Sequence, residues 1–82
     1  AVYPNPSAKG EPFNVSITAN AGDEVLIVVR DLLGREFYSK VVILSNDKEV
    51  IAVDPSGSIA AGVYIVVATS NHNIYEKKIV IK

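Results

Sequence analysis

Apolar stretches in this chain are short, and turn-forming residues interrupt them at a spacing of roughly 8–12 residues. The interruptions are clusters of Gly, Pro, Asn, Asp and Ser. Between them, apolar and polar residues alternate or form brief runs rich in Val and Ile, and no segment shows a convincing helical repeat. This pattern is typical of a sandwich of antiparallel strands. We therefore expect an all-β fold, an immunoglobulin-like antiparallel β-sandwich of about seven strands.

The positions of the turn residues place each expected strand. The expected strands are Ala1–Tyr3, Phe13–Ala19, Glu24–Arg30, Glu36–Leu44, Glu49–Asp54, Val63–Ser70 and Ile74–Lys82. Phe13–Ala19 alternates cleanly, as a half-buried strand does. Glu24–Arg30 is nearly all apolar, so we expect a central strand that is covered on much of both faces. The last two strands should pair as a hairpin.

Length and composition limit what the chain can be. With 82 residues it should form a single domain, residues 1–82. It has no Cys, so it has neither a disulfide nor a thiolate for a metal. The net charge of −1 gives no basic field for nucleic acid, and the apolar runs are far shorter than a membrane-spanning helix. The chain starts without a signal peptide, which suggests a piece excised from the C-terminus of a larger secreted protein.

Four motifs stand out by their order along the chain. In Tyr3-Pro4-Asn5-Pro6, two prolines around an asparagine make a stiff segment that cannot pair as a strand. In Asp31-Leu32-Leu33-Gly34-Arg35, Gly34 should supply the positive φ of a hairpin loop, and Asp31 can cap its own backbone. In Gly62-Val63-Tyr64-Ile65-Val66, Gly62 should permit close backbone approach, and Tyr64 should be a core anchor. The last motif is Lys77-Lys78-Ile79-Val80-Ile81-Lys82.

Taken together and ending at Lys82, these motifs closely resemble the type A C-terminal sorting domain of type IX (Por) secretion cargo from Bacteroidota. The resemblance extends over essentially the whole chain. It implies that a cargo protein precedes the domain, that the domain passes through the periplasm, and that the product is secreted or held at the cell surface. The implied partners are the type IX outer-membrane translocon and its shuttle and sortase proteins, and a surface sortase usually removes the domain. The resemblance thus predicts an address label for export, with no cofactor and no small-molecule substrate.

The candidate recognition residues all come from these motifs. They are Lys77, Lys78, Lys82, Tyr3, Pro4, Asn5, Pro6, Gly62 and Tyr64. The three lysines could contact the secretion machinery, whereas the alternative is that lysines on an edge strand only block aggregation. We also expect Lys77 to interrupt an apolar row of Tyr75, Ile79 and Ile81. For Pro4-Asn5-Pro6 and for Gly62, a structural role is the simpler interpretation. A partner could bind partly by adding a strand to the terminal edge.

Catalysis and metal binding find little support in the sequence. His72 is the only histidine, and it lies between two asparagines at an expected hairpin tip. A Ser–His–Asp arrangement from Ser56 or Ser58 with Asp54 and His72 is formally conceivable, but the chain has no nucleophile-elbow pattern. Loop carboxylates could in principle bind Ca²⁺, although they lack the dense alternation of a calcium loop. These carboxylates belong to Asp23, Glu24, Asp47, Glu49 and Asp54.

A rival hypothesis is a carbohydrate-binding or fibronectin-like spacer module of an extracellular enzyme. Sugar binding usually relies on exposed aromatic side chains. The chain has four Tyr, two Phe and no Trp, and most of the tyrosines lie on expected strands, where they should pack in the core.

Overall fold

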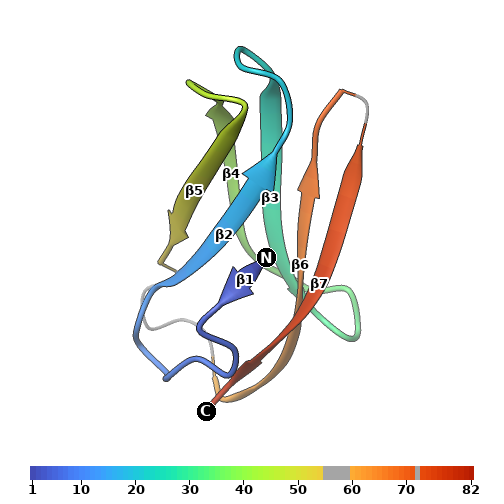
Figure 1. Ribbon diagram of the computed structural model, residues 1–82. Coiled ribbons are helices and arrows are strands. Elements are labelled where there is room, and N and C mark those ends of the chain that lie inside the picture. Colours follow the sequence, from blue (N-terminus) through green and yellow to red (C-terminus); the bar gives the residue numbers. More distant parts are fainter. Residues whose placement is uncertain (55–59, 72) are drawn as a thin grey trace.

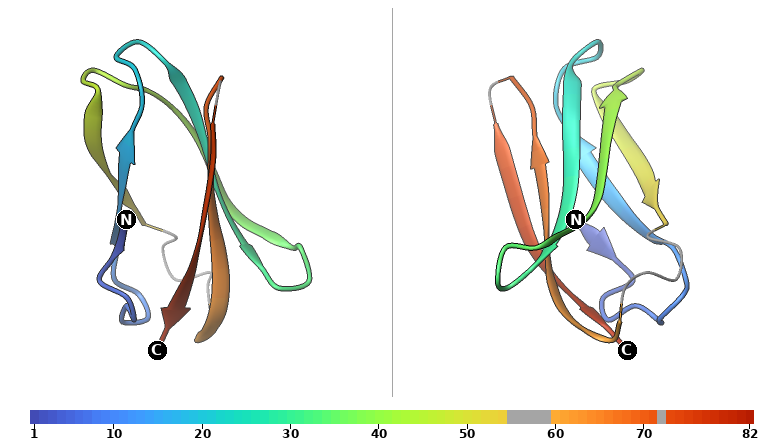
Figure 2. Two further views of the ribbon diagram at one scale, coloured as in Figure 1. Left: turned by 45° about the vertical axis from the view of Figure 1, so that its right-hand side comes forward. Right: turned by 180° about the vertical axis from the view of Figure 1, so that it is seen from behind.

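A computed structural model describes residues 1–54, 60–71 and 73–82 of the chain. In this part of the chain, seven strands form two antiparallel sheets that face each other (Figure 1, Figure 2). One sheet has the order β1-β2-β5, with bounds Val2–Tyr3, Phe13–Thr18 and Lys48–Val53. The other has the order β4-β3-β6-β7, with bounds Glu36–Ile43, Glu24–Asp31, Gly62–Thr69 and Ile74–Ile81.

This architecture confirms the expected all-β sandwich. Strands β6 and β7 form a hairpin whose register runs from Gly62 opposite Ile81 to Thr69 opposite Ile74. The fourth strand pairs with β3, and not with the fifth strand as in the seven-strand constant-domain arrangement. Near the start of β6, the Tyr64 hydroxyl donates a hydrogen bond of 2.6 Å to the carbonyl oxygen of Ala60. Such a tyrosine corner is characteristic of immunoglobulin-like sandwiches.

Alternate residues of the strands form one core between the sheets. Strand β2 contributes Phe13, Val15 and Ile17, and β3 contributes Val25, Ile27 and Val29; all six are buried. The remaining buried core side chains belong to Val2, Leu44, Ile51, Val53, Tyr64, Val66, Ala68, Ile79 and Ile81. Because side chains alternate with a period of two, each strand presents its other row to the outside.

The outer face of β3 corrects one expectation. We expected this central strand to be covered on much of both faces, but Leu26 is 38% exposed, and Val28 is only half-buried. The described residues form two layers, and neither layer packs over the outer side of this sheet. The apolar outer row is therefore covered only by its neighbours within the sheet, as in other antiparallel sheets with one wet face.

The β3–β4 hairpin confirms the expected turn chemistry. Gly34 has a φ of 89°, and the Asp31 carboxylate accepts hydrogen bonds from the backbone N–H groups of Leu33 and Arg35, both 2.9 Å. The pairing register shifts between Val29 and Arg30, so the hairpin begins with a bulge.

The described residues contain no helix that could span a membrane.

Two isoleucines of the same sheet test this assignment of core and surface. Replacing Ile27, which is fully buried, by alanine leaves a cavity and should lower the free energy of unfolding by about 2–5 kcal/mol. Replacing Ile43, which is 65% exposed, should change it by less than about 0.5 kcal/mol. Urea unfolding of both variants measures the difference. Equal destabilisation by the two substitutions would contradict the assignment.

Candidate functional site

Strand β7 lies at the edge of its sheet, so half of its backbone hydrogen-bonding groups face away from β6. The backbone groups of Lys78, Val80 and Lys82 point away from β6, because they form hydrogen bonds with the N-terminal loop. We define the N-terminal loop as residues 4–9. An edge strand with unpaired groups is a template for association, so the way these groups are satisfied decides what the edge can bind.

The Asn5 side chain spans two residues of the β7 edge. Its Nδ2 donates a 2.9 Å hydrogen bond to the Lys78 carbonyl oxygen, and its Oδ1 accepts a 3.1 Å hydrogen bond from the Val80 N–H. A side-chain amide has one donor group and one acceptor in the same plane, as a peptide group does. Asn5 thereby takes the place that a neighbouring strand would occupy.

The next residues of the loop continue this edge pairing with their backbones. Ser7 donates to the Val80 carbonyl and accepts from the Lys82 N–H, both at 2.8 Å, and Lys9 donates to the Lys82 carbonyl at 2.7 Å. Ser7 is buried, and its hydroxyl donates to the Pro4 carbonyl. The Tyr3–Pro4 and Asn5–Pro6 peptide bonds are both cis. The edge of β7 from Lys78 to Lys82 is therefore closed by the chain itself.

All four sequence motifs meet at this end of the sandwich. Within the sheet, Asp31 of β3 lies opposite Tyr64 of β6, and Tyr64 lies opposite Ile79 of β7. The start of β6, the end of β7 and the N-terminal loop lie near the C-terminus at the bottom of Figure 1, whereas the tip of the β3–β4 hairpin projects to the side. We call this region the motif end. Its components are far apart in sequence, so only the topology unites them.

The three candidate lysines are exposed, Lys78 and Lys82 at the motif end and Lys77 in the middle of β7. Lys77, Lys78 and Lys82 all lie on the surface, and the bond from Lys9 to Lys82 adds a fourth lysine that the sequence analysis missed. Nothing near Lys9 in the sequence indicates this pairing. Within the described residues, no acidic side chain forms a salt bridge with any of the four. Their ammonium groups are thus available to an acidic partner.

Lys77 interrupts the inner row of β7, as expected. It lies opposite Val66 in the β6–β7 register, between the half-buried Tyr75 and the buried Ile79 of the same row. Despite facing inward, Lys77 is exposed, because β1 is too short to cover this part of the sandwich edge. An inward-facing charge on an edge strand discourages the addition of a foreign strand.

Gly62 and Tyr64 shape the motif end from inside. Tyr64 is buried, and its ring meets Phe37 edge-on at a centroid distance of 5.6 Å, which confirms its place in the core. The close approach that we expected at Gly62 is absent: a Cβ there would lie 3.8 Å from Tyr64 Cε2, an ordinary contact. Glycine is favoured instead by its φ of +159°, which other residues rarely adopt.

Among the other candidates, Asn5 has a structural role through its hydrogen bonds, whereas Tyr3, Pro4 and Pro6 are exposed. Tyr3 pairs with Asn14 as part of β1. Its side chain is 43% exposed, so it belongs to the surface of this region and not to the core.

The tip of the β3–β4 hairpin exposes two leucines that the sequence analysis treated only as turn residues. Leu32 is 67% exposed and Leu33 is 83% exposed. Asp31 stabilises the base of the hairpin and also accepts a 2.6 Å hydrogen bond from Arg35 Nε. Ile43 and Ile74, at 65% and 70%, are exposed to a similar degree, so exposure alone does not single out the two leucines. Two adjacent leucines in a turn, where polar residues are typical, were the available sequence signal.

Electrostatics at Asp31 favour its ionised form. Desolvation alone would raise its pKa, but hydrogen bonds from the Arg35 amide, the Arg35 guanidinium and the Leu33 amide, together with the Arg35 charge, hold the pKa below its ordinary value. For Tyr38, burial and the nearby Asp54 carboxylate raise the pKa, so its hydroxyl stays protonated at neutral pH.

The residues considered for catalysis do not form a site in the described part of the chain. Ser56, Ser58 and His72 lie outside the described residues. Among the residues that are described, no three His, Cys, Asp or Glu side chains are grouped to hold a metal ion. Of the six aromatic residues, only Tyr3 is clearly exposed, so there is no row of aromatic side chains of the kind that sugars stack on.

Comparison with known protein families gives evidence from the sequence. The model described as the secretion system C-terminal sorting domain matches residues 1–82. A search of curated proteins gave no match.

The edge closure by Asn5 can be tested with one substitution. Replacing Asn5 by alanine removes both of its hydrogen bonds and should lower the free energy of unfolding by about 1–2 kcal/mol. Hydrogen exchange at the Val80 amide should accelerate in the same variant. Asn46, an exposed turn residue, provides the control: Asn46→Ala should change neither quantity appreciably. Unchanged Val80 exchange in Asn5→Ala would contradict the closure.

The Asp31 network predicts a pH dependence. Because folding lowers the pKa of Asp31, its contribution to stability is present above the ordinary value of 3.8 and is lost as pH falls through the lower folded value. NMR titration should show the Leu33 and Arg35 amide signals shifting together, with a midpoint below 3.8. The step should vanish in Asp31→Asn. A midpoint at or above the ordinary value would refute the network.

Proposed function

The chain belongs to the family of secretion system C-terminal sorting domains, and we propose that it directs an attached cargo protein across the outer membrane by the type IX secretion system. This family is a sorting signal and not a catalytic domain. Membership makes the chain a signal for type IX secretion, and it connects the chain with that machinery and with a secreted or cell-surface protein.

We propose the following steps of export. The cargo precedes the domain, the domain folds in the periplasm, and the translocon, shuttle and sortase proteins act on it in turn. The sortase then cleaves before the domain and releases it from the cargo.

The match of the sorting-domain family model to residues 1–82 is the observation that carries this proposal. The motifs also leave side chains exposed on the folded domain, among them Leu32, Leu33 and the lysines of the terminal strand.

The closed edge indicates how a partner binds. From the Lys78 carbonyl to Lys82, the outward backbone groups are already bonded to the N-terminal loop. Strand addition at this part of the edge would first require the loop to leave. We therefore propose that the machinery reads the folded surface through side chains, with Lys77, Lys78 and Lys82 as contacts to acidic groups.

Export of a reporter tests the proposal directly. The domain is fused behind a signal peptide, a fluorescent protein and a short linker, in a Bacteroidota host with an intact type IX system. Fluorescence should reach the cell surface or the medium in this host, and it should stay in the periplasm in a strain that lacks the system. Retention in both strains, with the domain folded, would refute the proposed function.

Charge substitutions identify the contacts. Replacing Lys78 and Lys82 together by glutamine should reduce export about tenfold or more, because two lost charge contacts of roughly 1 kcal/mol each weaken binding about 30-fold. The matched control replaces Lys40 and Lys48, which are exposed on β4 and β5, and should leave export unchanged. Lys77→Gln and Lys40→Gln form a second pair, since both lysines face inward from edge strands yet stay exposed. Equal loss of export in both members of each pair would mean that net charge, and not position, is read.

A further inference from the structure

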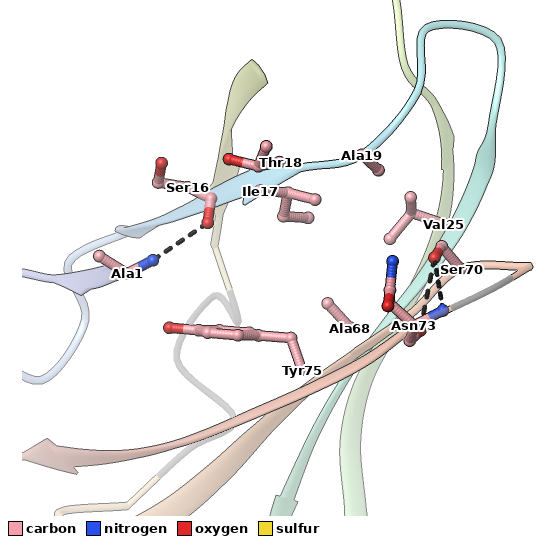
Figure 3. Close-up of a pocket in the computed structure, with 10 residues that line it drawn as sticks. All are labelled: Ala1, Ser16, Ile17, Thr18, Ala19, Val25, Ala68, Ser70, Asn73 and Tyr75. Carbon is pink, nitrogen blue, oxygen red and sulfur yellow. Dashed lines mark hydrogen bonds between the residues drawn. The ribbon is translucent and has the colours of Figure 1, made fainter. Parts of the chain in front are cut away.

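The sandwich is open along one side above β1. Strand β1 contains only Val2 and Tyr3, which pair with Val15 and Asn14. The rest of β2, from Ile17 onward, has no strand beside it on that side of its sheet. Opposite this gap, the upper part of β7 is also at an edge. The two sheets leave a slot between β2 and the upper part of β7, lined by residues of both (Figure 3).

A cavity of about 240 Å³ occupies this slot. Its apolar lining comes from inward-facing residues of both sheets, among them Ile17, Ala19, Val25, Ala68 and Tyr75. Two of these are alanines, whose small side chains leave the space unfilled. An apolar cavity of about 150 Å³ is enough to hold benzene, so this one can hold one or two aliphatic side chains.

The first residue of the chain lies at the mouth of this cavity. The Ala1 nitrogen donates a 3.0 Å hydrogen bond to the Ser16 carbonyl, and the Ser16 N–H donates a 2.7 Å bond to the Ala1 carbonyl. Figure 3 shows the Ala1 nitrogen among the residues that line the cavity, directed at Ser16. Ala1 thus continues the β1–β2 ladder by one residue. A residue attached to this nitrogen would continue in the same direction, along β2.

The register fixes what each preceding residue would meet. Ala1 lies opposite Ser16, so the residue before Ala1 would lie opposite Ile17, the second opposite Thr18 and the third opposite Ala19. Since Ile17 and Ala19 face the interior, the first and third preceding side chains would point into the cavity. The second would point to solvent beside Thr18, which is exposed.

The direction of the backbone groups of β2 permits this pairing. Ala19 N–H donates to the Asp47 carbonyl at 2.9 Å, on the side of β5, and Ile17 lies opposite Glu49 on that same side. Because backbone groups alternate in direction along a strand, the N–H and C=O of Thr18 face the open side, as those of Ser16 do. Thr18 therefore offers one donor and one acceptor to the second residue before Ala1.

We infer that the cargo segment immediately before Ala1 docks on the domain as a continuation of β1, pairing with β2 and filling the cavity with its first and third side chains. The inference rests on the proposed function only in requiring that a cargo polypeptide precedes Ala1. It predicts apolar residues at the first and third preceding positions. It also means that this segment must separate from β2 before a protease can bind it in extended form.

A disulfide scan on the full-length precursor tests the register. A cysteine at the second position before Ala1 should cross-link to Thr18→Cys, since residues in a hydrogen-bonded pair lie about 5.5 Å apart, within disulfide range. The same Thr18→Cys with a cysteine at the first or third position should cross-link at least tenfold more slowly, because those side chains point to the other face. The domain has no cysteine of its own, and peptide mapping identifies the bond.

A second measurement uses hydrogen exchange and needs no cysteine. In the unmodified precursor, the Thr18 amide should exchange its hydrogen at least tenfold more slowly than in a precursor with proline at the second position before Ala1. Proline has no N–H to donate to the Thr18 carbonyl, and it disrupts the ladder at that point. Equal exchange in both precursors, or cross-linking that does not depend on position, would overturn the inference.

The outcomes separate this inference from the proposed function. Cross-linking at the second position without type IX export would refute the proposed function and leave the docking intact. Export with no preferred cross-link would refute the docking alone.

Discussion

A β-sandwich that is not closed into a barrel leaves backbone N–H and C=O groups at its edges, and this constraint organises the whole domain. At the end of β7, the N-terminal loop satisfies these groups through the Asn5 amide and the backbones of Ser7 and Lys9. Elsewhere the protection is electrostatic: Lys77 and Lys40 face inward from the edge strands β7 and β4 yet remain exposed. The N-terminal loop thereby attaches the first residues of the domain to β7 and covers the edge of that strand.

The fold could be read from the sequence because its determinants are local. Alternation in Phe13–Thr18 and the turn chemistry of Asp31 and Gly34 depend on neighbours within a few residues. The outer face of β3 could not be read in this way. Leu26 has the same apolar character as the buried Ile27, and only the number of layers in the fold decides that one stays partly exposed.

The candidate site was predictable as a list of motifs but not as a place. The motifs could be recognised one by one, whereas their meeting depends on strand order, which brings Asp31, Tyr64 and Ile79 side by side across the sheet. The role of Asn5 is the clearest case. In the sequence it is a polar residue between two prolines, and its two partners, Lys78 and Val80, are nearly a full chain length away. Lys9 joined the basic group for the same topological reason.

That distance along the chain has a consequence for timing. The bond from Asn5 to Lys78 joins residues 73 positions apart, and the bond from Lys9 reaches the final residue, Lys82. Contacts with such long sequence separation require the largest loop to close and tend to form late in folding. Synthesis proceeds from Asn5 towards Lys82, so the N-terminal loop has no partner until residues 78–82 have been made. Until the loop has closed, the outward backbone groups of this edge lack these partners and can associate with other chains.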